Sequence, residues 1–416
     1  MEDLMKFRSM KTLNVSGKKV LVRLDINSPL DTQTKEIINT NRIAKSIPTI
    51  EWLVSQGAKV ALIAHQGDTD DYQNLITMEE HAHILSFMLN KTVVYVDDVC
   101  GPTAQEKVKT LQDGEIVLLG NLRYLAEEIS VFEKVVPLEA QQMLSCYLVR
   151  SLAPLFDFYI NDAFSAAHRK SPSMVAFQQV LPSAAGLLFF DEVQALSQIL
   201  LAPEHPCVFV LGGSRIGDAF GMMQSVLENK TADAILTCGI TGQIFLLAKG
   251  VALGDKTMSF LEKKSLLKYV AEAKTYLERF PENIYMPLDF AYLDSSGMRK
   301  EEVVTESMQS YSYGDIGSKT IDQYSKLLTS AKTIFVNGPA GIYEQKEFQL
   351  GTEALWQTIA SSSAYSVVGG GDSVNAATKF TELSDWSYIC TAGGAMVQFL
   401  AGKKLPLIEA MEQGTC

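Results

Sequence analysis

The 416-residue sequence has no paired-cysteine motif and no long apolar run. Its six cysteines form no C-x-x-C pair, and several lie within apolar stretches, which predicts reduced and mostly buried thiols. They are Cys100, Cys146, Cys207, Cys238, Cys390 and Cys416. No stretch reaches the roughly 18 uninterrupted apolar residues of a membrane span, and the first residues lack a signal-peptide pattern. We therefore expect a cytoplasmic protein with no membrane partner.

The chain also has no excess of positive charge. Lysine and arginine number 36 against 48 aspartates and glutamates, which gives a formal net charge of −12. An acidic protein is a poor partner for nucleic acid or for an anionic membrane surface. Any positive charge that binds an anionic substrate must therefore be local.

Three common catalytic signatures are absent as well. The chain has neither GxxxxGK[ST] nor GxGxxG before a helix, which argues against P-loop NTPases and NAD-linked dehydrogenases. No serine lies in GxSxG, so we do not expect a covalent intermediate. A phosphate-binding site in this chain must be of another type.

Apolar strand-like runs that end in polar residues or glycine are abundant. Helix-like stretches alternate with them, which is typical of βαβ units, and the length predicts two or three domains. In a parallel sheet, residues beyond the carboxyl ends of the strands meet in one crevice. The pattern predicts an α/β protein with two doubly wound parallel-sheet lobes. The runs lie at 19–27, 59–67, 116–123 and 158–169, and at 208–218, 234–242, 333–344, 365–373 and 388–394.

The helix-like stretches lie at 42–56, 78–89, 137–155, 189–201, 263–279 and 357–362. Segment 181–201 shows no strand signal and carries helical spacing of apolar residues, so we predict a long helix that joins the lobes. Disorder is expected at the termini and in a loop near 293–305.

Glycine clusters mark the strand ends of the second half. Gly369, Gly370 and Gly371 precede Asp372, Ser373 and a helix-compatible run, where backbone N–H groups can meet phosphate oxygens. Asp372 could hold Mg²⁺, although a single cluster is more simply a tight turn with Asp372 as its cap. Further clusters favour a phosphate site. They are Gly212 with Gly213, Gly338 with Gly341, and Gly393 with Gly394.

The strand and helix ends of the first half carry arginine, histidine, aspartate and asparagine. Each has an ordinary structural explanation, but several arginines near one crevice indicate a site for a small anion. The residues are Asp25, Asn27, Arg42, His65, Arg123, His168 and Arg169.

These segments resemble, in order, the phosphoglycerate kinase family, particularly its archaeal branch. The likeness runs from about Lys18 to the end of the chain. Its motifs in the first half are VRLDINSPL, TNRI, LIAHQG, NLRYLAEE and NDAFSAAHRKSPS, and those in the second half are LGGSRIGD, VNGPAGIYE, VVGGGDS and TAGGAMVQFLAGKKLPLIEAM.

The resemblance implies phosphoryl transfer between 1,3-bisphosphoglycerate and ADP, which gives 3-phosphoglycerate and ATP with Mg²⁺. It implies an N-terminal lobe, residues 1–185 completed by 395–416, for the anionic substrate, and a C-terminal lobe, residues 186–394, for the nucleotide. In the family the lobes close around a hinge. A monomer or small homo-oligomer is expected, with no nucleic-acid partner.

Carried over position by position, the resemblance implies contacts with phosphoglycerate from Asp25, Asn27, Arg42, His65, Arg123 and Arg169. The implied nucleotide site comprises Gly212, Gly213, Arg215, Gly239, Asn337, Glu344, Gly369, Gly370, Gly371, Asp372 and Ser373, with Glu344 at the ribose and Asp372 at the metal. The implied catalytic positions are Arg42, Arg215, Gly371 and Gly394.

The chain departs from the family at several of these positions. Arg215 stands where the family has its catalytic lysine, and Ala219 where many members have a second one. An acidic loop from Asp68 to Asp71 follows His65, where an arginine is usual. Two alternatives therefore stay open: a paralogous kinase acting on a different small carboxylate, and a catalytically silent nucleotide-binding protein.

Overall fold

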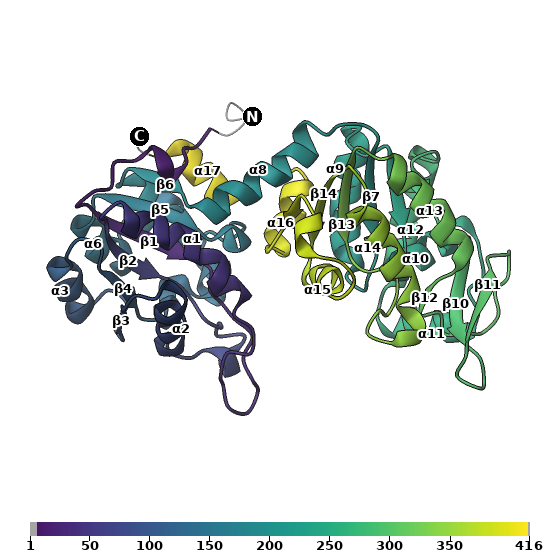
Figure 1. The fold of residues 1–416 in the computed structure, drawn as a ribbon, viewed down its shortest axis with the longest axis horizontal. Coiled ribbons are helices and arrows are strands. Elements are labelled where there is room, and N and C mark those ends of the chain that lie inside the picture. Colours follow the sequence, from purple (N-terminus) through teal and green to yellow (C-terminus); the bar gives the residue numbers. More distant parts are fainter. Residues whose placement is uncertain (1–5, 415–416) are drawn as a thin grey trace. The chain divides into compact units, whose positions relative to one another are not determined.

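The computed structural model describes residues 6–414 and contains two compact units. Unit 1 comprises Met1–Gln194 with Lys404–Cys416, and unit 2 comprises Ala195–Lys403. The boundary falls within helix α8 (Leu187–Leu201), and the chain returns to unit 1 before helix α17 (Pro406–Gln413), as Figure 1 shows. Among the described helices, none has the length and apolarity needed to cross a membrane.

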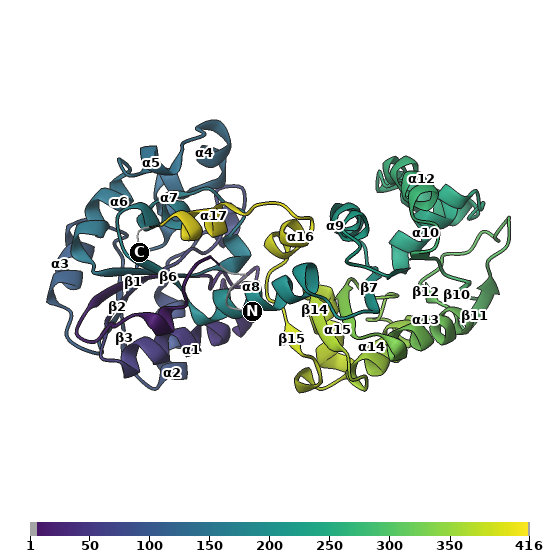
Figure 2. The ribbon, with the colours of Figure 1, turned by 90° about the horizontal axis from the view of Figure 1, so that it is seen from above.

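Unit 1 is built on a six-stranded parallel sheet in the order β3-β4-β2-β1-β5-β6. Helices α1 (Asn41–Ser55) and α2 (Glu79–Leu89) lie on one face, and α6 (Tyr147–Leu152) and α7 (Pro172–Val175) on the other (Figure 2). The strands are largely apolar and mostly buried, since both faces are covered, although β1 also contains Arg23 and β5 contains Asn161 and Asp162. They are β1 (Lys19–Leu24), β2 (Lys59–Ile63), β3 (Val93–Val96), β4 (Ile116–Leu119), β5 (Phe158–Asp162) and β6 (Ser183–Ala185).

Unit 2 repeats this plan with a six-stranded parallel sheet in the order β15-β14-β13-β7-β8-β9. Its strands are β7 (Cys207–Leu211), β8 (Ala234–Thr237), β9 (Ile284–Tyr285), β13 (Thr333–Asn337), β14 (Tyr365–Gly369) and β15 (Tyr388–Ile389). One face carries α9 (Ile216–Glu228), α10 (Gly239–Lys249) and α12 (Val270–Arg279), and the other carries α13 (Ser318–Ser330), α14 (Leu350–Ala360) and α15 (Gly371–Phe380) (Figure 2). The predicted class, two parallel-sheet α/β lobes, is confirmed.

Unit 2 also contains a small antiparallel sheet in the order β11-β10-β12. Its strands are β10 (Asp289–Leu293), β11 (Arg299–Val303) and β12 (Asp315–Ile316). The prediction of a loop near 293–305 is therefore wrong over β11. That strand reads Arg-Lys-Glu-Glu-Val, so its polarity hides it from an apolar-run search.

Three predicted helices are shorter or broken. The strand β6 occupies part of 181–201, and α8 begins only at Leu187. Segment 137–155 contains α5 (Ala140–Met143) and α6, separated where Cys146 is extended at φ −62° and ψ 147°. Segment 263–279 is interrupted after α11 (Asp255–Lys263), where Ser265 has φ +56°.

The cysteines within residues 6–414 are free thiols, and all but Cys146 are buried, as predicted. Cys416 lies outside the described residues.

Candidate active-site pockets

Four arginines gather around one histidine at the carboxyl ends of the strands in unit 1. Arg23 lies on β1, Arg42 in the first turn of α1, Arg123 just beyond β4 and Arg169 beyond β5. All four lie near enough to His65 for their positive charges to lower its pKa. Five residues that are far apart in the sequence thus form one cationic cluster.

His65 is neutral in this cluster. Burial lowers its pKa well below the usual value, and the arginines lower it further. Arg23 Nη2 lies 2.9 Å from His65 Nδ1, and since a guanidinium can only donate, Nδ1 must accept. Nε2 therefore carries the proton, and His65 can donate one hydrogen bond to an anion.

The predicted residues Asp25 and Asn27 shape the rim of the cluster. Asp25 Oδ2 accepts from Arg42 Nη1 at 2.8 Å, and Asn27 Oδ1 accepts from the backbone N–H of Gly67 at 3.1 Å. The Asp25 side chain is 5% exposed and that of Arg42 is 37% exposed. A buried carboxylate thus anchors an arginine that reaches toward solvent.

Arg123 and Arg169 share a carboxylate at the other side of the cluster. Asp68 Oδ2 lies 3.4 Å from Arg123 Nε and 3.5 Å from Arg169 Nη1. Glu133 Oε2 lies 3.2 Å from Arg169 Nη2. Burial lowers the pKa of Arg123 to about 10, and the charge of Arg169 acts in the same direction. Two guanidinium groups are held close together in a partly desolvated place.

Arg23 and Glu128, which are linked through Ser173, were not predicted as site residues. Arg23 is 1% exposed and donates to Ser173 Oγ at 3.3 Å, while Glu128 accepts from Ser173 N at 2.6 Å and Ser173 Oγ at 2.7 Å. Burial lowers the pKa of Arg23 and raises that of Glu128. The available signal was an arginine inside an otherwise apolar strand, which is costly unless it is paired.

In unit 2, the loops after β7 and β13 cross in van der Waals contact. Gly213 N donates to Pro339 O at 2.8 Å, and Gly212 N to Asn337 O at 3.0 Å. A Cβ at Gly338 would lie 2.1 Å from Gly212 O, and Gly338 has φ +90°. Only glycine fits at such a crossing.

Three helices begin beside this crossing without a side-chain cap. Arg215 precedes α9, Gly370 precedes α15, and Gly393 precedes α16 (Gly394–Leu400). Their first N–H groups lack intrahelical partners and form a natural anion site. A small pocket of about 80 Å³ lies here, lined in part by Gly213, Arg215, Asp218, Asn337, Gly371 and Asp372.

Two predicted nucleotide residues have structural contacts of their own. Ser373 is 1% exposed, and its Oγ accepts from Gly338 N at 2.6 Å. A Cβ at Gly369 would lie 2.1 Å from Met396 Sδ, so this glycine lets β14 pack against α16. Both residues hold the glycine loops in place.

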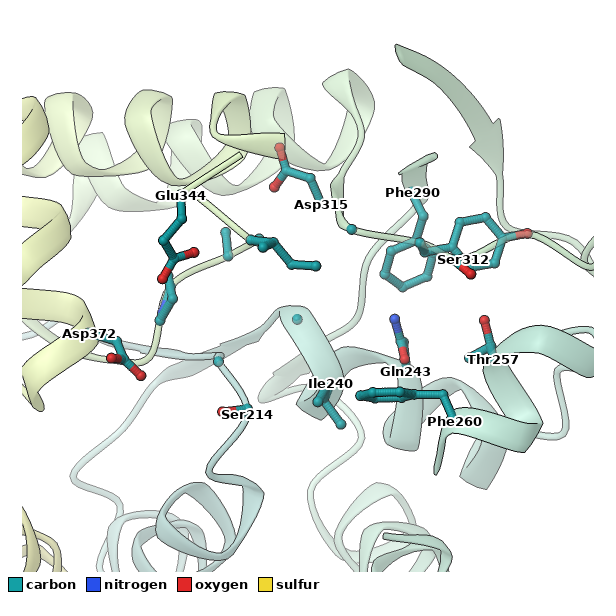
Figure 3. Close-up of a pocket in the computed structure, with 18 of the residues that line it drawn as sticks. Ser214, Ile240, Gln243, Thr257, Phe260, Phe290, Ser312, Asp315, Glu344 and Asp372 are labelled. Carbon is teal, nitrogen blue, oxygen red and sulfur yellow. The ribbon is translucent and has the colours of Figure 1, made fainter. Parts of the chain in front are cut away.

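A larger cavity of about 400 Å³ continues from the glycine loops. Figure 3 shows Ser214, Glu344 and Asp372 at one end and Phe260 and Phe290 at the other. Gly213 and Gly239, both predicted, also line it. The cavity therefore has a polar end beside the helix N-termini and an apolar end, as a nucleotide requires.

Most of the apolar lining was missed by the sequence analysis. Phe260 and Phe290 belong to stretches that carry no motif, whereas Ile240 directly follows the predicted Gly239 and Ile342 lies within the motif VNGPAGIYE. The signal that could have found Ile240 was the position of Gly239 at a strand end.

A cation cluster in one α/β unit and a glycine-lined pocket at helix N-termini in the other are features of a phosphotransferase, that is, a kinase. The family model described as phosphoglycerate kinase matches residues 10–403. The chain belongs to the phosphoglycerate kinase family, as its motifs predicted.

Individual relatives agree with this assignment. The chain is 40% identical to the phosphoglycerate kinase of Methanothermus fervidus over 98% of this chain and 97% of the relative. It is 40% identical to that of Pyrococcus furiosus over 95% of each. The crystal structure of phosphoglycerate kinase from Pyrococcus horikoshii OT3 matches with a TM-score of 0.86 and 37% identity over 97% of this chain and 98% of that one. The structure of phosphoglycerate kinase from Coxiella burnetii matches with a TM-score of 0.82 and 30% identity, over 98% of this chain and 99% of that one.

Proposed function

We propose that this chain transfers a phosphoryl group between the acyl phosphate of 1,3-bisphosphoglycerate and ADP, giving 3-phosphoglycerate and ATP. The observation that carries the proposal is the family match over residues 10–403. A chain whose relatives align over nearly their whole length retains both units that this reaction needs.

The arginine cluster of unit 1 takes the phosphoglycerate in this proposal. Guanidinium forks match carboxylate and phosphate oxygens, and neutral His65 adds one N–H donor. The substrate contacts are Asp25, Asn27, Arg42, His65, Arg123 and Arg169. Arg42 is suited to the transferring group because it is more exposed than the two other ion-paired arginines of the cluster, at 37% against 2% for Arg123 and 18% for Arg169.

The glycine loops of unit 2 take the nucleotide. The phosphates lie at the uncapped starts of α9, α15 and α16, the ribose near Glu344, and the base toward Phe260 and Phe290. The contacts come from Gly212, Gly213, Arg215, Gly239, Asn337, Glu344, Gly370, Gly371 and Asp372, with Gly369 and Ser373 holding the loops.

Asp372 fits a magnesium ion bound together with the nucleotide. It is exposed in the first turn of α15 and lines both pockets. Among the residues that the structure describes, no group of three or more His, Cys, Asp or Glu side chains could hold a metal by itself. Magnesium commonly binds through one or two carboxylates plus substrate phosphates, where it neutralises charge during transfer.

The chemical step needs positioning and charge stabilisation more than a base. A carboxylate oxygen of 3-phosphoglycerate attacks the γ-phosphorus of ATP while the bond to the ADP oxygen breaks, and in the opposite direction the roles reverse. Arg42, Arg215 and the N–H groups at Gly371 and Gly394 stabilise the charge on the transferring group.

A coupled assay tests this function. Purified protein with 3-phosphoglycerate and MgATP should produce an acyl phosphate that a dehydrogenase reduces, with a matching loss of NADH. Other small carboxylic acids of similar size serve as controls. Turnover with one of these acids and none with 3-phosphoglycerate would contradict the proposal, and so would nucleotide binding without any turnover.

A further inference from the structure

Asp68 carries a carboxylate between two arginines of the substrate cluster. Its Oδ2 lies 3.4 Å from Arg123 Nε and 3.5 Å from Arg169 Nη1. Ser130 donates to Asp68 from its hydroxyl and, at 3.3 Å, from its backbone N–H. The side chain is only 15% exposed. A carboxylate that is held by two guanidiniums and a hydroxyl has the environment that a bound anionic ligand would have.

The pairing is close but imperfect. Within residues 6–414, Arg123 Nε is a buried donor that lacks a hydrogen-bond partner, because Asp68 lies near it without good alignment. A buried donor without a partner is costly, and a ligand oxygen can satisfy it. Burial would raise the pKa of Asp68, but the hydrogen bonds from Ser130 and the charge of Arg123 outweigh it and lower the pKa. Asp68 is therefore ionised at neutral pH.

The charges of the cluster nearly cancel as a result. Arg23, Arg42, Arg123 and Arg169 supply four positive charges, and Asp25, Asp68, Glu128 and Glu133 supply up to four carboxylates. Asp25, Glu128 and Glu133 each anchor a particular arginine or serine. Asp68 differs because its single Oδ2 lies near two arginines at once.

We propose that Asp68 is an internal anion that competes with the substrate for Arg123 and Arg169, and so sets the affinity and selectivity of the site. This inference rests on the proposed function for its substrate, 3-phosphoglycerate. A phosphate group with two negative charges displaces a carboxylate more readily than a ligand with one charge does. Asp68 therefore favours phosphate-bearing acids over acids that carry only a carboxylate.

The variant Asp68→Asn tests the competition, because asparagine keeps the size of the side chain and one oxygen that accepts from Ser130. We expect it to bind 3-phosphoglycerate and inorganic phosphate about tenfold more tightly than the native chain, by calorimetry at fixed ionic strength. The KM for 3-phosphoglycerate should fall by a similar factor, with a smaller change in kcat. The preference for 3-phosphoglycerate over phosphate-free acids should narrow.

Asp70→Asn is the matched control. Asp70 lies two residues away, its side chain is 62% exposed, and it pairs with Lys134 at 3.6 Å. The Asp70→Asn substitution removes the same charge without touching the arginines. The affinities of this variant for 3-phosphoglycerate and phosphate should therefore stay within about twofold of the native values. Asp68→Ala provides a second variant, and thermal unfolding in saturating phosphate shows whether each variant is folded.

Equal or weaker phosphate and 3-phosphoglycerate binding by folded Asp68→Asn and Asp68→Ala would overturn the inference. An equal gain in Asp70→Asn would do so too, because it would trace the effect to net charge alone. Tighter phosphate binding by Asp68→Asn without turnover of 3-phosphoglycerate by any version would support the competition and reject the proposed function, so the two failures are distinguishable.

Discussion

The two partners of the Arg42–Asp25 ion pair differ in burial and therefore in function. Asp25 is 5% exposed and fixed by the strand end, while Arg42 is 37% exposed and extends from the first turn of α1. Because the carboxylate is held in place, the guanidinium is oriented before any ligand arrives. Such preorganisation lowers the cost of ordering groups in a transition state.

Arg42→Ala should reduce kcat/KM for 3-phosphoglycerate by about 10²–10³-fold, the range for loss of one preorganised charge stabiliser. The substitution removes the charge that we propose acts on the transferring group, and it leaves Asp25 without its 2.8 Å partner. Steady-state kinetics with 3-phosphoglycerate and MgATP measure the loss. Arg42→Lys keeps the charge but not the planar guanidinium fork, so its kcat/KM should lie between those of the native enzyme and Arg42→Ala. A folded Arg42→Ala enzyme with native kinetics would contradict the role given to Arg42.

His81 is a buried residue of helix α2 that contacts Gln66, the neighbour of His65 in the sequence. Burial lowers its pKa to about 4, and its Nε2 lies 3.1 Å from Gln66 Oε1. In the unfolded chain its pKa is about 6.5, so the unfolded state binds more protons between those values. Its contribution to stability is complete above pH 6.5 and is lost as pH falls toward 4.

Between pH 7 and pH 5, the native chain should therefore lose about 2 kcal/mol more unfolding free energy than His81→Gln does. Urea unfolding of both proteins at the two pH values gives the comparison. The difference between the proteins isolates His81 from other titrating groups, including Asp162 and Asp315, whose pKa values burial raises to about 6. If the unfolding free energies of the native chain and His81→Gln fell equally between pH 7 and pH 5, His81 would not be held neutral in the folded state.

At the scale of elements, the apolar runs of both large sheets were predictable because buried parallel strands carry nearly continuous apolar sequence. Strands β1, β2, β4 and β5 fall within predicted runs. Two of the missed strands lack that signal: β6 reads Ser-Ala-Ala, and β11 carries four charged residues. Strand β3 (Val93–Val96) is apolar and was missed as well; it is only four residues long, and one of the four is buried. The clustering of arginines followed from strand ends, whereas Arg23 and Glu128 were not found because both are buried and are linked through Ser173, which lies far from each of them in the sequence.

The crossing of the loops after β7 and β13 gives an element-scale prediction. Gly338→Ala should lower stability by about 2–4 kcal/mol and weaken ATP binding, because the added methyl meets Gly212 O and the backbone has a left-handed φ. Urea unfolding and calorimetry measure the two effects.

Gly221→Ala is the matched control. Gly221 lies inside helix α9, and the added methyl group would lie 3.7 Å from Val397 Cγ1 of helix α16, an ordinary contact distance. This variant should keep native ATP affinity and gain about 0.5–1 kcal/mol from helix propensity. If Gly338→Ala behaved like Gly221→Ala, the close crossing would not be needed for nucleotide binding.

At the scale of the whole molecule, each unit has its own core; unit 1 carries the arginine cluster, and unit 2 carries the glycine-lined pockets. One buried cluster includes Val22, Leu62 and Ile160 of unit 1, and another includes Val210, Val336 and Val368 of unit 2. This arrangement agrees with the proposal that each unit holds one ligand. The family was predictable from motif order, whereas the apolar lining of the nucleotide pocket was not, because lining residues such as Phe260 and Phe290 are defined only by the fold.

The central proposal is that unit 1 binds 3-phosphoglycerate and unit 2 binds the nucleotide. Hydrogen exchange followed by mass spectrometry on the full chain tests it. Saturating 3-phosphoglycerate alone should slow exchange in segments around Asp25, His65 and Arg169, and MgATP alone in segments around Gly213, Gly338 and Gly371. Two separate sets of protected segments are expected, one in each unit. Protection of the arginine-bearing segments by MgATP alone, with none there from 3-phosphoglycerate, would contradict the proposal.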